Sequence, residues 1–305
     1  MRSTLLLGIA VCACLPAQVR FSRDQISIDV DKKPFTTFYY GADYRRPFLA
    51  PLRSASGKIV TRHYPMEEVA GESRDHPHHT GLWFCYDDVN GTKFWDNDTT
   101  KPHIGRIEVR NAQYKDGDRS GTLTATMDWR DPSGKILVVE DRIMTVYADP
   151  KLRILDFDIT MTAAEDLTFG DTKEGAFAIR LADAFTEKQG ARMVDADGRA
   201  TMANIWGKRS NWVDYTAELE GERLGVAIFD HPQNPRHPTY WHARDYGLFA
   251  ANPFGRKAFD PKQEESQWKL PKGQKLRFRW RVVIHPGDAQ TGHVSDLYQQ
   301  YAAGK

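Results

Sequence analysis

Apolar and polar residues alternate along most of the chain with a period of two. In residues 25–30, 121–129 and 152–162, almost every second side chain is apolar. This period places one face of an extended chain on a core and the other in water, so it predicts half-buried strands. Other segments share this pattern or are rich in β-branched and aromatic residues: 36–40, 107–110, 136–147, 176–181, 224–229 and 276–284.

Short polar turns separate these segments, for example at residues 115–118 and 131–134. Turns between short strands at regular spacing are typical of antiparallel sheets. A helical pattern is clear only at residues 294–303, where Leu297 and Tyr301 are four positions apart. The sequence predicts an all-β fold, a large antiparallel β-sandwich with few short helices, formed by residues 19–305 as a single domain.

The first residues have the pattern of an export signal. Arg2 is followed by an apolar run over residues 5–15 and then by Pro16-Ala17-Gln18. A positive start, an apolar stretch of this length and small residues after it are typical of a cleaved signal peptide. We expect residues 1–18 to be removed and the mature protein to be periplasmic or extracellular. Lipidation of Cys14 is the alternative.

Removal of that signal would leave Cys85 as the only cysteine, because Cys12 and Cys14 lie within it. The mature chain would then contain no intramolecular disulfide, and its core would have to hold it together. Cys85 lies in the apolar run 82–86, which favours a small buried hydrophobe over a nucleophile.

The charge balance argues against a nucleic-acid partner. The chain has 42 Lys and Arg against 41 Asp and Glu, with no basic tail or run. We likewise expect no membrane contact beyond the possible lipid anchor. Aromatic residues are plentiful, with 8 Trp, 12 Tyr and 15 Phe. Many of the tryptophans lie in polar segments rich in Gly and Pro, which favours a site lined by aromatic rings.

Three of the ten histidines, His76, His78 and His79, fall within four residues, behind Asp75 and around Pro77. Pro77 removes a ladder donor, so we expect a loop or a strand edge. In an extended chain His76 and His78 would point to one side and His79 to the other. Imidazoles serve as acids and bases, as substrate contacts, as metal ligands and as structural groups, and all of these roles remain open here.

A second histidine-rich segment, residues 229–242, repeats the Asp-His-Pro sequence. Its prolines predict that residues 234–242 form neither a strand nor a helix. On a loop, Arg236 could bind a carboxylate or sugar hydroxyls, and Trp241 could stack on a sugar ring. His237 and His242 could reach the first cluster and form one shared site. A proline-rich loop held by its own aromatic residues is the structural alternative.

Glu174 is the best candidate base, because its carboxylate lies at the start of the predicted strand 176–181 beside Lys173. Arg180 lies further along that strand. An exposed Lys–Glu pair is the structural alternative. Residues 87–91 end in Asn-Gly and predict a turn rather than a cation loop. Residues 206–215 place Trp212 in a polar loop, where it could serve as an aromatic platform or pack at an edge.

Nucleotide-binding and serine-hydrolase motifs are missing from the sequence. We find no Gly-x-Ser-x-Gly, P-loop, Gly-x-Gly-x-x-Gly or Cys-x-x-Cys pattern. Nucleotide cofactors and serine-hydrolase chemistry are therefore not expected.

Several of these motifs, in this order, resemble a family of secreted bacterial proteins labelled "methane oxygenase PmoA" or a domain of unknown function. The resemblance covers almost the whole mature chain. The family is similar in strand pattern to the galactose-mutarotase-like supersandwich, a fold common among carbohydrate-active enzymes. The matching segments are 46–48, 51–52, 75–83, 88–91, 94–95, 173–175 with Arg180, 234–239, 241–242, 246–248 and 252–255.

Together the residues and the resemblance predict an exported carbohydrate-active enzyme. It would use His/Glu acid–base chemistry on a sugar or glycoside, as a lyase, an epimerase or a glycoside hydrolase. The alternatives are a non-catalytic carbohydrate-binding protein, and a metal-dependent oxidase or hydrolase with a divalent metal on the histidine cluster. No cofactor is otherwise expected. The predicted catalytic residues are His78, His79, Glu174 and His237. The predicted substrate contacts are Arg74, His76, Arg180, Arg236, Trp212, Trp241 and His242.

Overall fold

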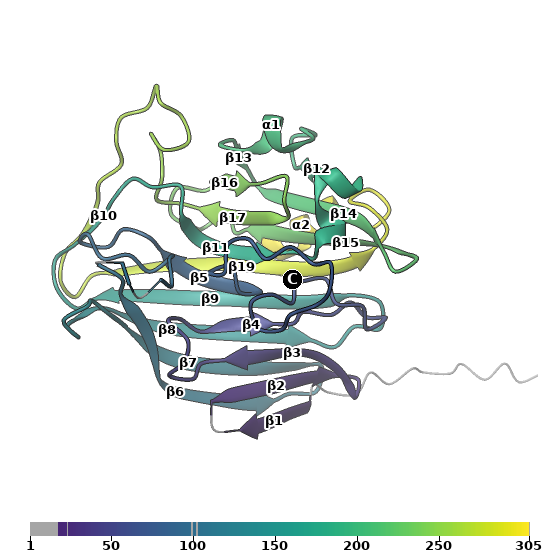
Figure 1. Ribbon diagram of the computed structural model, residues 1–305, viewed down its shortest axis with the longest axis horizontal. Coiled ribbons are helices and arrows are strands. Elements are labelled where there is room, and N and C mark those ends of the chain that lie inside the picture. Colours follow the sequence, from purple (N-terminus) through teal and green to yellow (C-terminus); the bar gives the residue numbers. More distant parts are fainter. Residues whose placement is uncertain (1–17, 23, 99, 102, 305) are drawn as a thin grey trace, which may run out of the picture.

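The computed structural model describes residues 18–22, 24–98, 100–101 and 103–304. Apart from residue 18, the predicted signal segment 1–18 therefore lies outside the described residues. In the described part of the chain, two large antiparallel sheets pack face to face (Figure 1). This confirms the predicted all-β class and the large antiparallel sandwich.

The first sheet has nine strands, which follow one another from β1 at the bottom of Figure 1 to β13 at the top. In spatial order they are β1 (Gln18–Ser22), β2 (Gln25–Val30), β3 (Lys33–Tyr39), β4 (Phe48–Ala50), β5 (Leu82–Tyr86), β11 (Gly175–Arg180), β17 (Leu248–Asn252), β16 (Thr239–Ala243) and β13 (Arg209–Ser210).

The second sheet has eight strands, and a two-stranded ribbon lies beside the sandwich. The order in the second sheet is β12 (Arg192–Asp195), β14 (Trp212–Leu219), β15 (Glu222–Asp230), β19 (Lys275–Pro286), β9 (Arg153–Ala163), β8 (Ile136–Tyr147), β7 (Ser120–Arg130) and β6 (Arg106–Asp116). The ribbon pairs β10 (Leu167–Phe169) with β18 (Trp268–Leu270). The helices are η1 (Asp183–Phe185), η2 (Glu187–Gln189), α1 (Met202–Ile205) and α2 (Val294–Ala302).

The core lies between the two sheets and is rich in aromatic rings. Phe177 of β11 stacks on Trp280 of β19 at 4.9 Å between ring centroids. Phe84 of β5 contacts both Trp129 of β7 and Trp280. Because Phe84 and Phe177 are register partners on neighbouring strands, their side chains enter the core from the same face of the nine-stranded sheet.

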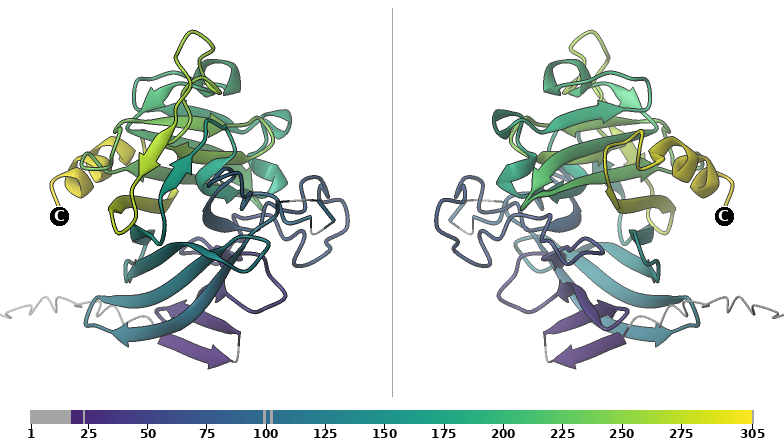
Figure 2. Two further views of the ribbon diagram at one scale, coloured as in Figure 1. Left: turned by 90° about the vertical axis from the view of Figure 1, so that its left-hand side faces the viewer. Right: turned by 90° about the vertical axis from the view of Figure 1, so that its right-hand side faces the viewer.

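The opposite face of the nine-stranded sheet, called here the outer face, carries the alternate residues of the same strands. In register across β16, β17, β11 and β5, these are His242, Ala250, Ala178 and Trp83. β5 and β11 are buried along their whole length, so this face is covered as well. Figure 2 shows the loops before and after β5 on one side of the sandwich and α2 on the other.

Helix α2 covers the eight-stranded sheet, on the face that points away from the core. Its buried residues Val294, Tyr298 and Tyr301 form a small apolar cluster with Trp212 and Phe229. The predicted helix 294–303 is thus present with nearly the predicted bounds. Among the described residues, no helix is long and apolar enough to cross a membrane.

Two expectations for local structure were wrong. A strand was excluded over residues 234–242, yet β16 begins at Thr239, directly after the last proline of the segment, Pro238. Trp212 was placed in a polar loop, but it opens the strand β14. In each case sheet pairing extends into a segment whose polar composition resembled a loop.

Two other local predictions are confirmed. Cys85 is fully buried, and burial raises the pKa of its thiol to about 12, as suits an inert apolar side chain. Residues 89–92 form a tight turn, in which Asn90 and Gly91 both have positive φ and Val89 and Thr92 exchange backbone hydrogen bonds.

Candidate functional site

The three clustered histidines lie in one turn above the outer face, called here the histidine loop (residues 75–79). His76 has a φ of 44°, and the His79 amide donates to the His76 carbonyl at 3.0 Å. This turn brings all three rings into contact, with centroid distances of 4.8 Å for His76–His79, 4.4 Å for His78–His79 and 5.7 Å for His76–His78. The segment is thus a loop, as Pro77 led us to expect, and its three rings do not alternate as they would in an extended chain.

Asp75 connects the histidine loop to the sheet. Its Oδ1 accepts hydrogen bonds from the guanidinium groups of Arg62 and Arg180, the latter at 2.7 Å. Its Oδ2 lies 2.8 Å from His76 Nδ1. Burial alone would raise the pKa of Asp75, but the charge of Arg180, the contact with His76 and the charge of Arg62 outweigh it and lower the pKa. Asp75 is therefore an ionised anchor.

His79 is the most buried member of the loop, with 1% of its surface exposed. Its ring stacks on Trp83 at 5.4 Å and meets Trp95 edge-on at 5.8 Å. Burial, followed by the charges of His78 and Arg180, lowers its pKa far below the usual value. His79 is therefore a neutral ring packed into the loop, which favours the structural role among the alternatives.

His78 is half-buried, and its pKa is lowered to about 4 by burial and then by the charge of Arg46. The Arg46 guanidinium also donates a hydrogen bond to the His78 carbonyl. The imidazole is thus neutral at neutral pH. At neutral pH the ring can accept or donate a hydrogen bond, but it does not carry the second proton of an imidazolium.

Glu174 and His242 form a second group on the outer face. Glu174 directly precedes β11, and its Oε1 contacts Lys173 Nζ. Its Oε2 lies 4.0 Å from His242 Nε2. The other ring nitrogen of His242 accepts a hydrogen bond from the indole N–H of Trp206 at 3.0 Å. Because an indole can only donate, His242 carries its proton on Nε2, directed toward Glu174.

Asp87 lies next to Glu174, directly after β5. Its amide donates to the Glu174 carbonyl at 3.1 Å, since the two residues extend neighbouring antiparallel strands. Burial raises the pKa of the Asp87 carboxyl to about 6; the charge of Lys93 opposes this shift and that of Glu174 adds to it. Two carboxyl groups in different environments are a common arrangement for acid–base chemistry. Asp87, Glu174 and His242 are called here the acid–base group.

Tyr246 lies between the histidine loop and the acid–base group. Its ring stacks on the His76 ring at 5.0 Å between centroids, and the Arg180 guanidinium lies over it, 4.7 Å from the ring centroid. Burial raises the pKa of its hydroxyl to about 12; the arginines oppose this shift, and the charges of Glu174 and Asp75 add to it. Burial, then the charges of Lys173, Arg244 and His76, lowers the pKa of His242 to about 3. The histidine loop and the acid–base group thus act on one another electrostatically.

The remaining predicted site residues lie elsewhere. His237 Nδ1 contacts Asp230 Oδ2 at 2.7 Å, away from the histidine loop. Arg74 is exposed and pairs with Glu68 at 3.1 Å. Trp241 is fully buried and donates to the Ser210 carbonyl, and Trp212 lies beneath α2. Neither tryptophan can stack on a ligand, so those two predictions were wrong for reasons of burial.

Of the residues that the sequence singled out, the structure therefore brings six together: His76, His78, His79, Arg180, Glu174 and His242. It adds others that sequence reasoning did not select. Asp87 was interpreted as part of a turn, although its place at the end of an apolar strand was a signal that could have identified it. The added residues are Arg62, Asp87, Trp206 and Tyr246.

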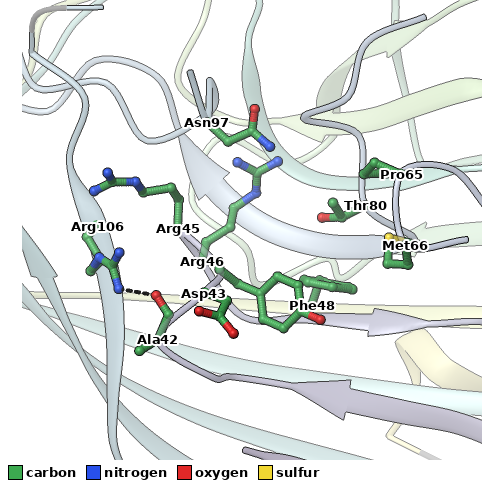
Figure 3. A pocket seen from close by; sticks show the side chains of 11 residues that line it. Ala42, Asp43, Arg45, Arg46, Phe48, Pro65, Met66, Thr80, Asn97 and Arg106 are labelled. Atoms are coloured by element: carbon green, nitrogen blue, oxygen red, sulfur yellow. Dashed lines mark hydrogen bonds between the residues drawn. The ribbon is translucent and has the colours of Figure 1, made fainter. Parts of the chain in front are cut away.

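A cavity of about 400 Å³ borders the histidine loop on its other side (Figure 3). Three arginines line it, Arg45, Arg46 and Arg106, together with the carboxylate of Asp43 and the hydroxyl of Thr80. The Arg46 guanidinium donates to the Trp95 carbonyl at 2.8 Å as well as to that of His78. Arg46 therefore fixes the position of the histidine loop from the side of this cavity.

A metal centre has no support in this geometry. In the part of the chain that the structure describes, no three His, Cys, Asp or Glu side chains converge as metal ligands. The rings of His76 and His79 stack on one another, and the His78 ring meets both of them edge-on. The alternative of a metal on the histidine cluster therefore has no donor set among these residues.

Comparisons with known proteins give a family and several similar folds. Residues 25–299 match a family of unknown function, DUF6807. This agrees with the expected domain of unknown function, and the methane oxygenase label is not part of that description. The search of curated proteins found no match.

Solved structures of similar fold include two α-galactosidases and an epimerase. The α-galactosidase from Lactobacillus brevis is 10% identical with a TM-score of 0.47, over 93% of this chain and 42% of that one. The GH36 α-galactosidase AgaA from Geobacillus stearothermophilus is 11% identical with a TM-score of 0.42, over 90% and 41%. The galactose 1-epimerase from Lactobacillus acidophilus is 9% identical with a TM-score of 0.40, over 90% and 99%. The chain thus spans about four tenths of the length of these galactosidases.

Proposed function

We propose that this chain, which belongs to the DUF6807 family of unknown function, is an exported carbohydrate-active enzyme that moves protons on a sugar or glycoside. The observation that carries the proposal is the pair of carboxyl groups at the ends of β5 and β11. Asp87 has a pKa raised to about 6, whereas Glu174 is ion-paired with Lys173. One group suits a proton donor and the other a proton acceptor.

The roles follow from the contacts. Asp87 gives a proton to a sugar oxygen, and Glu174 takes one from the substrate. The Nε2 proton of His242, whose position Trp206 fixes, faces the Glu174 carboxylate from 4.0 Å. On the other side, Tyr246 and His76 present half-buried polar groups held by Arg180 and Asp75. The histidine loop forms a wall of this site, and His78 and His79 keep neutral rings.

The surroundings suit a sugar. Trp206, Tyr240 and Tyr246 are half-buried aromatic side chains around the acid–base group, so part of each ring is open to a ligand. A polar ligand with one apolar face can stack on such rings while its hydroxyls bond to the polar groups. Epimerisation, β-elimination and glycoside hydrolysis all use an acid and a base in this way.

The test compares Glu174→Gln and Asp87→Asn with the wild type on a panel of glycans and glycosides. Both changes keep the shape of the side chain while removing the ability to exchange a proton. We expect turnover to fall by about 10²–10⁴-fold in each variant. Glu218→Gln is the matched control, because Glu218 is exposed on β14 of the other sheet. Wild-type turnover should decline above pH 6, as Asp87 loses its proton.

Unchanged turnover in both variants would remove the acid–base group from the mechanism. Binding of a sugar by the wild type with no product from any panel member would identify a non-catalytic binding protein instead. Export is tested separately: cell fractionation of the full chain should place the protein outside the cytoplasm, with Cys14→Ser showing whether a lipid holds it there.

A further inference from the structure

A strongly basic cavity lies on the outer face, next to the acid–base group. It has a volume of about 480 Å³ and is called here the arginine pocket. Its lining includes no Asp or Glu side chain. The residues that matter here are Arg209, Arg236, Arg256, Tyr240, Asn252 and Gln263.

The positive charges of this pocket are not neutralised by ion pairs. Among the residues that the structure describes, the salt bridges nearest in sequence involve Arg199, Arg223 and His237, and none includes Arg209, Arg236 or Arg256. Burial and then the charge of Arg256 lower the pKa of Arg236; Arg209 adds to this and Asp171 opposes it. Arg236 therefore lies close enough to both Arg209 and Arg256 to be repelled by their charges.

Asp171, the nearby carboxylate, is already engaged. Its two oxygens accept the backbone amides of Arg256, Lys257, Ala258 and Ser266 at 2.7–3.0 Å. A carboxylate bound in this way to four amides has little capacity left for a guanidinium. The pocket therefore keeps an excess of positive charge.

Backbone carbonyls hold the guanidinium groups in place. Arg209 donates through Nε to the Pro238 carbonyl at 2.7 Å, and through one Nη to that of Arg236. Arg236 donates through one Nη to the Phe254 carbonyl at 3.0 Å, while its guanidinium lies over Trp268 at 4.4 Å. The Arg256 guanidinium donates to the side-chain carbonyl of Gln263 at 3.1 Å. Each guanidinium thus keeps further N–H groups for a ligand, already oriented.

The pocket borders the acid–base group at two points. Tyr240 and His242 are two positions apart on β16, so their side chains leave the same face about 7 Å apart. Asn252, at the end of β17, donates to the Thr172 carbonyl at 3.0 Å, and the Thr172 hydroxyl accepts the amide of Glu174 at 3.1 Å. The arginine pocket thus adjoins the acid–base group through Tyr240 on β16 and Asn252 on β17.

We propose that the arginine pocket binds the oxyanion of an acidic saccharide, a uronate carboxylate or a sulfate ester, and so positions the neighbouring sugar at the acid–base group. This rests on the proposed function and names its substrate class. Guanidinium groups bind planar carboxylates and sulfates through paired charge-assisted hydrogen bonds. A neutral sugar would leave the three positive charges uncompensated.

The test measures binding rather than turnover. Glucuronate, glucose 6-sulfate and glucose are titrated calorimetrically into the full-length protein at low and at high salt. We expect one of the two acidic sugars to bind at least about tenfold more tightly than glucose, with an affinity that falls as salt rises. Whichever of glucuronate and glucose 6-sulfate binds more tightly shows whether the pocket prefers a carboxylate or a sulfate ester. Glucose binding as tightly as both acidic sugars would overturn the proposal.

Variants locate the binding. Arg256→Gln and Arg209→Gln should each weaken the acidic sugar about tenfold or more, and should leave glucose binding unchanged. Arg119→Gln removes the same charge from the exposed β6–β7 turn of the other sheet and is the matched control. Arg256 is the cleaner position, because the one hydrogen bond that its side chain makes within the described part of the chain is to Gln263. Equal losses in the control would point to net charge and overturn the assignment.

Glu174→Gln separates this proposal from the proposed function. It should bind the acidic sugar as the wild type does, because the arginine pocket is intact. If the acidic sugar binds to both proteins but the wild type turns over no glycan, the pocket stands and the catalytic proposal fails. If turnover is found only on neutral glycans and is insensitive to Arg256→Gln, the pocket proposal fails alone.

Discussion

Burial determines which of the clustered side chains can exchange a proton near neutral pH. His79 is packed between Trp83 and Trp95, and His242 is held between Trp206 and Glu174. Desolvation favours the neutral form of both rings. For a carboxyl the same effect favours the protonated form, so burial of Asp87 keeps a proton available near pH 6.

A first prediction follows for His79. Replacing it with Ala should remove a buried ring from between two tryptophans and lower the free energy of unfolding by about 2–4 kcal/mol. His78→Ala should cost clearly less, because the His78 ring is only half-buried. Urea denaturation of both variants measures the difference. Equal stability of His79→Ala and the wild type would show that the ring does not support the loop.

The types of residue at the site were readable from the sequence, but their burial was not. The Asp-His-Pro-His-His segment and Glu174 attract attention through composition alone. Trp241 and Trp212 looked equally suitable, and the fold places one in the core and the other under α2. Which face of the sheet a side chain occupies depends on the register of its strand, which is β16 for Trp241 and β14 for Trp212. The prolines before β16 make its register hard to read from the sequence.

At the scale of elements, β5 and β11 are the frame of the site. Asp87 follows the end of β5, Glu174 precedes β11, and the Arg180 amide donates to the Gly81 carbonyl at 2.8 Å. The same two strands thus hold the acid–base group at one end and the histidine loop at the other. Alternation predicted several long strands well, such as β9, because one face of each lies on the core.

Gly81 joins the histidine loop to β5 and gives the second prediction. Its φ is +58°, and an added Cβ would lie 2.2 Å from the Leu49 carbonyl oxygen. Gly81→Ala should therefore cost roughly 1–2 kcal/mol for the left-handed backbone and about 1–3 kcal/mol more for the clash. Gly57→Ala is the control, since Gly57 has φ +96° with nothing within 4 Å of the added Cβ. Similar thermal unfolding of the two variants would contradict the close approach.

At the scale of the whole molecule, the buried imidazoles couple stability to pH. The pKa is lowered to about 4 in His78, about 4 in His231 and about 3 in His242, with burial the largest cause in each. Their unfolded value is near 6.5, so below that pH the unfolded chain binds protons that the folded chain does not. Asp87 acts in the opposite direction, because its folded pKa of about 6 exceeds its unfolded value.

We therefore expect the free energy of unfolding to fall as pH drops from 6.5 toward 4. His79, whose folded pKa is lowered further still, is a fourth imidazole of this kind. Four imidazoles against the single carboxyl of Asp87 give a net uptake of about three protons on unfolding near pH 5. Urea denaturation at pH 7, 6 and 5 measures it. His242→Gln should reduce the slope by about one proton, because it removes one imidazole that the folded chain cannot protonate. His293→Gln, at an exposed position, should leave the slope nearly unchanged. Asp87→Asn should steepen it, since the folded chain then loses the group that retains a proton between pH 4 and 6. If the free energy of unfolding were the same at pH 7 and pH 5, these imidazoles would be open to water in the folded protein. That result would contradict the burial of the histidine loop.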